Sequence, residues 1–211
     1  MSTLSPNQNK LKILITGGNG DLAKGLYHDL SDSYDISLPD KNELNVSSIE
    51  SVSSYFRNNE FDIIVNAAGT LYSSNFLDSE PEKWIRDIEV NLIGTYLISR
   101  FGIEKNKNVV ILNISSTAAY ASYSDWTSYC AAKAGVMKLS SGMLKEGFNI
   151  ITLCPGAIDT KIRNGLKINN PNVMTLSEGI QPIKDSIKGK YKSGDIVFYR
   201  KNELEIRSDF E

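Results

Sequence analysis

The feature that most limits the possible folds of this chain is the alternation of short apolar runs with longer segments of helical spacing. The runs at residues 12–16 (KILIT), 62–66 (DIIVN) and 149–153 (NIITL) place apolar residues next to one another, which is typical of strands covered on both faces. Between such runs, segments like residues 21–30 repeat leucine at helical spacing. Strands joined by helices in this way predict an α/β fold: a doubly wound parallel sheet with right-handed crossovers and helices on both faces.

The same alternation extends along the whole chain. Strands are expected at residues 12–16, 34–38, 44–46, 62–66, 108–114, 149–153 and 196–199, about seven in all. Helices are expected at residues 21–30, 48–58, 82–100, 129–144 and 176–187. No repeat or linker divides the chain, so residues 1–211 are expected to form a single domain. Residues 1–10 are expected to be disordered, and residues 161–187 to form the substrate-loop or lid region.

The composition argues against several classes of function. With 23 basic and 25 acidic residues, the chain has no basic tract that would favour nucleic acid. No apolar run approaches the ~18 residues that cross a bilayer, and the polar start MSTLSPNQNK lacks the apolar core of a signal peptide. A single histidine, His28, and the lack of a Cys/His cluster argue against a structural zinc site. We therefore expect a cytoplasmic protein that acts on a small molecule, without metal, membrane or nucleic acid.

The first expected strand ends in a glycine-rich turn, TGGNGDLA, at residues 16–23. Ligands of parallel sheets bind beyond the carboxyl ends of the strands. A helix that follows a glycine turn offers free N–H groups and its positive dipole end to a phosphate. The spacing Gly17-x-x-Gly20-x-x-Ala23 approximates the dinucleotide-binding fingerprint, with a small residue where the helix packs on the strand. The Asp21 carboxylate would repel a pyrophosphate, so it is expected to point outward.

The ends of the later strands add residues at the same edge of the sheet. Asp40, about 20 positions past the glycines, can accept hydrogen bonds from an adenosine ribose and favours NAD. Lys41 beside it can instead attract the 2′-phosphate of NADP, and a plain polar turn is a further alternative. Small residues in NAAG, 66–69, leave space for a dinucleotide, while NISS and PGAIDT, which end at Ser116 and Thr160, deliver hydroxyl groups.

Taken in order, the motifs TGGNGDLA, NAAG, VNLIG, NISS, YCAAK and PGAIDT resemble those of the short-chain dehydrogenase/reductase family. The resemblance covers residues 12–160, and its specificity lies in the order of the motifs, because YxxxK alone is nonspecific. It implies a Rossmann-like fold. It also implies an oxidoreductase that interconverts a secondary alcohol and a ketone or aldehyde by hydride transfer with NAD or NADP, of which NAD is favoured.

The resemblance assigns roles to individual residues. Tyr129 matches the catalytic tyrosine of the family, Lys133 its lysine, Ser116 its substrate-orienting serine and Asn91 the asparagine of its proton relay. Cofactor contacts are implied for Gly17, Asn19, Gly20, Asp21, Leu22, Asp40, Asn45, Val46, Asn66, Ala67, Ala68, Gly69, Tyr129, Lys133, Pro155, Gly156, Ile158 and Thr160. The chain also departs from the family: asparagine replaces the usual aspartate at position 45, and the segment before it is too short for a full helix.

Tyr129 and Lys133 lie one helical turn apart in the segment SYCAAKAG. A free tyrosine has a pKa near 10, so lowering it toward 7 requires about 3 pKa units, or ~4 kcal/mol. The charge of Lys133, together with that of a nicotinamide ring, would stabilise the phenolate. Tyr129 would then donate a proton to a carbonyl, or remove one from an alcohol.

Other functions fit parts of the sequence. A non-catalytic dinucleotide-binding sensor or scaffold would share the glycine turn, although such proteins often lose the tyrosine or lysine. A nucleotide-sugar epimerase or dehydratase needs a substrate domain after Gly156, where the remaining chain is short. Lys161, Arg163 and Lys167 in the expected substrate loop fit either an anionic substrate or a solvated loop. By resemblance, the protein is expected to form a homodimer or homotetramer.

Overall fold

The computed structural model of the chain describes residues 10–164, 166 and 170–208. These residues form a seven-stranded sheet with the order β2-β1-β3-β4-β5-β6-β7. Its strands are β1 (Lys12–Ile15), β2 (Asp35–Ser37), β3 (Ile63–Asn66), β4 (Val110–Ile114), β5 (Asn149–Pro155), β6 (Ile196–Arg200) and β7 (Glu203–Arg207). All neighbouring strands are parallel except β6 and β7, which pair antiparallel. The predicted Rossmann-like α/β fold is thereby confirmed.

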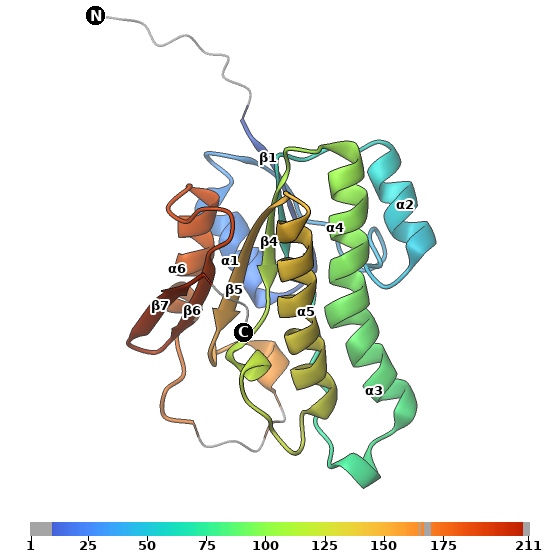
Figure 1. Cartoon of the computed structure of the whole chain (residues 1–211), viewed down its shortest axis with the longest axis vertical. Coiled ribbons are helices and arrows are strands. Elements are labelled where there is room, and N and C mark those ends of the chain that lie inside the picture. Colours follow the sequence, from blue (N-terminus) through green and yellow to red (C-terminus); the bar gives the residue numbers. More distant parts are fainter. Residues whose placement is uncertain (1–9, 165, 167–169, 209–211) are drawn as a thin grey trace, which may run out of the picture.

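Helices cover both faces of the sheet (Figure 1). On one face lie α1 (Asp21–Leu30) and α6 (Leu176–Ile187), which pack on strand residues such as Ile13 and Leu153. The other face is covered by α2 (Ile49–Arg57), α4 (Gly94–Lys105) and α5 (Thr127–Lys145), packed on residues such as Leu14 and Ile64. Successive strand residues point to opposite faces, so each strand needs apolar residues in succession to fill both cores. This explains the continuous apolar runs in the sequence.

The long helix expected at residues 82–100 is present, with a change of winding inside it. It begins as α3 (Pro81–Ile88), passes through the π-helical turn η2 (Glu89–Ile93) and continues as α4 to Lys105. Pro81 lies in the first turn, where its missing N–H removes no helical hydrogen bond. Single π-helical turns occur often at functional sites, and Asn91 lies in this one with no exposed surface. Short 3₁₀ turns complete the structure: η1 (Phe76–Asp78), η3 (Thr117–Ala119) and η4 (Lys161–Arg163).

The prediction of a strand at residues 44–46 is wrong. These residues lie in a turn region, where Leu44 and Val46 are buried in the same core as α2 and α4. A parallel partner for β2 would need a crossover of about a dozen residues or more, and the chain between Ser37 and Leu44 is shorter than that. Leu44 instead donates its N–H to the Asp40 carbonyl at 2.9 Å, which closes a tight turn.

The last strand, β7, was not expected from the sequence. It follows β6 through a turn at Lys201 and Asn202, and Asn202 has a φ of 62°, in the left-handed region that asparagine tolerates. The strand count therefore matches the prediction although the set of strands differs. The sheet lacks the strand expected beyond β2 and gains an antiparallel strand beyond β6.

Part of the sequence-based prediction falls on residues that are not described. Of residues 1–10, expected to be disordered, only Lys10 is described, and Lys167 of the expected substrate loop also lies outside the described residues. Within the described ranges, no helix combines the length and apolar character needed to cross a bilayer.

Candidate active site

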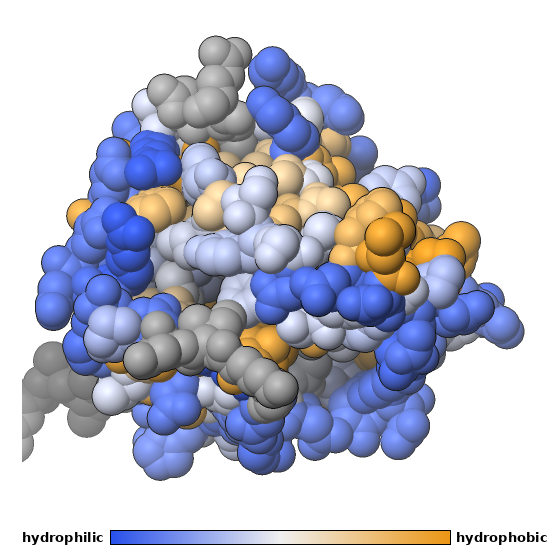
Figure 2. Space-filling model, turned by 90° about the horizontal axis from the view of Figure 1, so that it is seen from below, coloured by the Kyte–Doolittle hydropathy of each residue, from blue (hydrophilic) through white to orange (hydrophobic). Residues whose placement is uncertain are grey.

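The carboxyl ends of the parallel strands open into a cavity of about 690 Å³. Figure 2 looks onto this end of the molecule, where weakly polar and apolar surface lies at the centre, a strongly apolar patch lies to its right, and hydrophilic side chains cover much of the remaining rim. The predicted site residues that line the cavity are Leu22, Ala67, Gly69, Asn91, Ser116, Tyr129, Lys133, Pro155, Gly156, Ile158 and Thr160. The structure thus brings together all four predicted catalytic residues. The remaining predicted cofactor residues do not line this cavity.

The glycine turn after β1 is packed closely against its neighbours. Gly17 has a φ of 75°, and a Cβ there would lie 2.9 Å from the Cα of Ala68. A Cβ on Gly18 would lie 2.2 Å from the Leu38 carbonyl oxygen, so the turn accepts no side chain at that position. Thr16 Oγ1 accepts the N–H groups of Ala67 and Ala68 at 3.1 and 3.0 Å, which fixes the end of β3 beside the turn.

The N-terminus of α1 directs its free N–H groups toward this turn. Gly20 is the N-cap and supplies no side-chain cap, which suits the close approach of an anion. Asn19 is exposed beside it. Asp21 Oδ2 accepts the backbone N–H of Lys161 at 2.6 Å, so its carboxylate is directed to the loop that follows β5.

Asp40 and Asn45, which were predicted to contact the adenosine, both accept hydrogen bonds from residues of their own turns. Asp40 Oδ1 accepts the backbone N–H groups of Asn42 and Glu43 at 2.7 and 3.2 Å. Asn45 Oδ1 accepts the hydroxyl of Ser47 at 2.9 Å. Asp40 was predicted from its position to accept hydrogen bonds from the ribose of NAD. One of its carboxylate oxygens already accepts two hydrogen bonds that close the turn, so those bonds would compete with the ribose.

Asn66 has its side chain inside the protein, away from the cavity. Its Nδ2 donates to Ser99 Oγ at 3.0 Å and to Asn113 Oδ1 at 2.9 Å, and Asn113 in turn donates to Ser140 Oγ at 2.9 Å. This buried network connects β3 and β4 to α4 and α5. A contact of residues 66–69 with a dinucleotide would consequently involve backbone and small side chains rather than the Asn66 amide.

The loop after β5 forms the opposite wall of the cavity. Gly156 donates its N–H to the Tyr199 carbonyl at 2.7 Å, and a Cβ there would lie 2.6 Å from the Cβ of Arg200. Ile158 forms an isolated parallel bridge with Met174, and the Thr160 hydroxyl donates to the Ile158 carbonyl at 3.2 Å. The substrate loop is thereby closed at its base.

Tyr129, Lys133 and Ser116 meet at the centre of the cavity. Tyr129 and Lys133 come from successive turns of α5, and Lys133 Nζ lies 5.5 Å from the centroid of the Tyr129 ring. Lys133 is 5% exposed, and its Nζ donates to the Ile114 carbonyl at 2.9 Å. Ser116, at the end of β4, donates a long hydrogen bond of 3.4 Å to the Pro155 carbonyl.

Burial governs the ionisation of this pair. It raises the pKa of Tyr129 to about 12, while the Ser116 hydroxyl opposes the shift and the negative charge of Asp87 reinforces it. Burial also lowers the pKa of Lys133 to about 8, against the attraction of Asp87. The expected lowering toward 7 needs the charge of a nicotinamide ring as well as that of Lys133; in the chain alone, desolvation of the phenolate raises the Tyr129 pKa instead. The phenol is therefore protonated at neutral pH.

Asn91 has an incompletely satisfied amide beside the cavity. Its Nδ2 donates to the Thr70 and Asp87 carbonyls, both at 2.9 Å, and to Asp87 Oδ1 at 3.1 Å. Among the described residues, no donor reaches Asn91 Oδ1, which faces Gly69. This buried acceptor fits a ligand or a water molecule that donates a hydrogen bond.

Several residues of the site were missed from the sequence. Asp87 lies one helical turn before Asn91, and an acid at that spacing was a possible signal. The hairpin of β6 and β7 contributes Arg200, Lys201 and Glu203 to the cavity wall. The sequence pattern that could have predicted β7 is the alternation of polar and apolar residues in ELEIR, directly after the turn residue Asn202.

Comparison with known proteins agrees with this architecture. In the solved structures, a small-chain dehydrogenase in complex with NADPH superimposes with a TM-score of 0.80 at 17% identity and covers 90% of this chain and 96% of its own. A short-chain dehydrogenase from Burkholderia cenocepacia in complex with NADP gives a TM-score of 0.75 at 21% identity, covering 87% of this chain and 86% of its own. At these identities the likeness shows the fold.

Curated relatives match shorter regions. A probable oxidoreductase, EphD, of Mycobacterium bovis is 38% identical over 109 residues, which is 48% of this chain and 18% of that protein. The 3-oxoacyl-(acyl-carrier-protein) reductase FabG of Aquifex aeolicus is 28% identical over 160 residues, 70% of this chain and 64% of that protein. In both cases the matched region spans less than two thirds of the relative. The family model of the short chain dehydrogenases matches residues 34–171, and the chain therefore belongs to the short-chain dehydrogenase family.

Proposed function

We propose that the protein is an NAD(P)-dependent oxidoreductase that interconverts a small carbonyl compound and the corresponding alcohol. The observation that carries this proposal is the protonated phenol of Tyr129 in the cavity, beside Ser116 and one helical turn from Lys133. The oxidoreductase names of the curated relatives and the NADPH and NADP named for two structural neighbours support it.

The residues around the cavity fit a dinucleotide. The turn at Gly17 and Gly18 has no space for side chains, the N-terminus of α1 lacks a side-chain cap, and Asn91 Oδ1 is an unmet acceptor. The turn and α1 would hold the pyrophosphate, while Pro155, Gly156, Ile158 and Thr160 would lie against the nicotinamide end. When bound, the nicotinamide would supply or accept the hydride.

The protein groups would then handle the proton and the substrate oxygen. Ser116 would orient the carbonyl oxygen by a hydrogen bond, and Tyr129 would donate its proton to that oxygen. In the reverse direction the same phenolate would accept the alcohol proton. The pKa of Tyr129 is raised to about 12 in the protein without a cofactor, so the phenol is protonated near neutral pH, which is the form that carbonyl reduction needs.

The experiment that tests this function is a titration with NADPH and with NADH, followed by energy transfer from Trp126, which lines the cavity. We expect one or both to bind. Asp40→Ala would weaken only NADH, and Lys41→Ala only NADPH, if these neighbours select the cofactor as their positions suggest. A panel of ketones and aldehydes would then be tested for turnover.

Each outcome is decisive. If neither dinucleotide binds, the oxidoreductase proposal is wrong. Binding without turnover of any carbonyl would favour the dinucleotide sensor.

Homodimer or homotetramer formation stays a prediction, supported by Ile85, Ile93 and Tyr96, which are 51%, 41% and 46% exposed along the long helical segment.

A further inference from the structure

Helix α3 buries an acid in place of an apolar side chain. All of α3 is described, and its one buried residue is Asp87, 1% exposed, whereas Ile85 of the same helix is 51% exposed. Placing a carboxylate in the interior is unfavourable unless hydrogen bonds and charge compensate it. The burial of Asp87 therefore needs a reason other than core packing.

The Asp87 carboxylate receives hydrogen bonds from three segments around the active site. Thr70 Oγ1 donates to Oδ1 at 2.6 Å, Ser128 Oγ donates to Oδ2 at 2.8 Å, and Asn91 Nδ2 donates to Oδ1 at 3.1 Å. Thr70 follows the cavity residue Gly69, and Ser128 precedes Tyr129. One carboxylate thus connects the loop after β3, the π-helical turn and the start of α5.

Charge couples Asp87 to Lys133 as well. Asp87 is the first of the groups that raise the pKa of Lys133, against the burial that lowers it to about 8. The other titratable groups that face Lys133 are Cys154 and Tyr129, and burial raises the pKa of each to about 12. Both are neutral near pH 7, so among the described groups around Lys133 the negative charge comes from Asp87.

We propose that Asp87 is a positioning residue of this site, whose carboxylate orients the Asn91 amide and the start of α5 and supplies the negative charge that balances Lys133. The inference rests on the proposed function for its catalytic meaning, but the coupling between Asp87 and Lys133 is a property of the protein without cofactor. Substrate would meet Tyr129 and Ser116, and Asp87 would act through its neighbours.

The test is a pH titration of the lysine Cε resonances by NMR on the protein without cofactor. The Lys133 signal is assigned by its loss in Lys133→Met. We expect Asp87→Asn to shift the Lys133 midpoint downward by about one pH unit, because a neighbouring opposite charge is removed. The matched control is Asp195→Asn, a second buried aspartate in the turn before β6, which should leave the midpoint unchanged.

An unchanged Lys133 midpoint in folded Asp87→Asn would overturn the proposal, even if the melting temperature fell, because a purely structural role predicts that result. Should Asp87→Asn fail to fold, the reciprocal measurement decides: Lys133→Met must raise the midpoint of the Asp87 carboxyl carbon, since coupling is mutual. No rise would overturn the proposal. NADPH binding is measured separately on the same proteins, so a failure of the oxidoreductase function is distinguishable from a failure of this coupling.

Discussion

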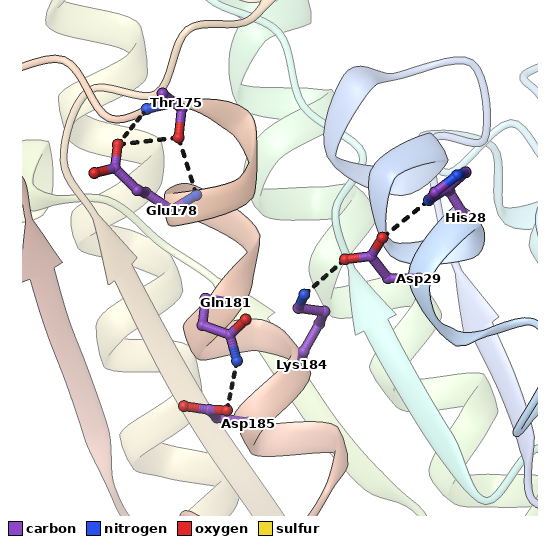
Figure 3. Close-up of polar contacts among 7 residues, drawn as sticks. All are labelled: His28, Asp29, Thr175, Glu178, Gln181, Lys184 and Asp185. Atoms are coloured by element: carbon purple, nitrogen blue, oxygen red, sulfur yellow. Dashed lines mark hydrogen bonds and ion pairs between the residues drawn. The ribbon is translucent and has the colours of Figure 1, made fainter.

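Two clusters of charged side chains on opposite faces of the sheet are arranged in different ways. On the face of α1 and α6, Lys184 Nζ pairs with Asp29 Oδ2 at 2.6 Å, and Asp29 also meets His28 at the protein surface (Figure 3). On the face of α3 and α5, Asp87 and Lys133 are 1% and 5% exposed, and neither takes part in an ion pair of the described residues. In the first cluster Lys184 and Asp29 meet directly, whereas in the second the two opposite charges are both buried and do not pair.

This difference separates stabilising from functional polar groups. Exposed ion pairs contribute about 0–1 kcal/mol each. A buried charge without an ion-pair partner reduces the free energy of unfolding and shifts its own pKa, as Lys133 does. A protein keeps such groups where the chemistry needs them, so the α3 and α5 face is the one where activity and stability should respond differently to substitution.

The sharpest test of this contrast compares half-buried Tyr129 with buried Tyr199. Tyr129→Phe removes the cavity phenol, and we expect turnover to fall by about 10²–10⁴-fold, the range for loss of a general acid. Tyr199→Phe removes a hydroxyl that donates to the Gly179 carbonyl at 2.9 Å on the α6 face. We expect that variant to lose about 1–3 kcal/mol of unfolding free energy and to retain turnover. Steady-state kinetics and urea unfolding measure both, and equal losses of turnover would contradict the contrast.

The second test concerns Lys133 and the pH dependence of stability. Because the folded pKa of Lys133, about 8, lies below its ordinary value of 10.5, the unfolded chain holds a proton that the native protein releases between these values. Wild-type stability should rise with pH in this window relative to Lys133→Met, by about 2 kcal/mol between pH 7 and 9.5. Urea unfolding at each pH checks this, and a constant difference for Lys133→Met would refute it.

The smallest effect is expected at the N-terminus of α6. Thr175 and Glu178 form a capping box there, in which Thr175 Oγ1 accepts the Glu178 N–H at 3.2 Å and Glu178 accepts the Thr175 N–H at 2.7 Å (Figure 3). Thr175→Ala should lower the unfolding free energy by about 1 kcal/mol, while Ser177→Ala, an exposed position in the same turn, should have little effect. Dinucleotide affinity should be unchanged in both variants, and a large loss of affinity would show that the two faces are not independent.

The parts of the site that could be predicted from the sequence are those set by local pattern and topology. The glycine turn, the Tyr129–Lys133 spacing and Ser116 at a strand end all follow from where parallel strands finish, and the structure brings them to one edge. Side-chain direction was less predictable, because Asp40 and Asn66 had partners available in their own turn or in the core. The burial of Asp87 could not be predicted from the sequence, because a charged residue in an amphipathic helix usually faces solvent.

The fold shows the same limit. The strand at residues 44–46 looked plausible as an isolated apolar run, and only the short connection to β2 rules it out. Conversely, β7 has two exposed apolar residues, Leu204 and Ile206, which are 50% and 46% exposed, so it does not resemble the buried strands that define the rest of the sheet.

The hairpin of β6 and β7 forms a wall of the cavity that belongs to a different part of the sheet from the glycine turn after β1. Its turn, at Lys201 and Asn202, reaches the rim, while the glycine turn and α1 stand at the opposite end of the strand order. Exchange or lengthening of this two-residue turn would alter what the rim admits without disturbing the pairing of β1 with β3. Under the proposed function, the substrates that the rim admits would therefore be set by a different part of the chain from the residues that line the centre of the cavity.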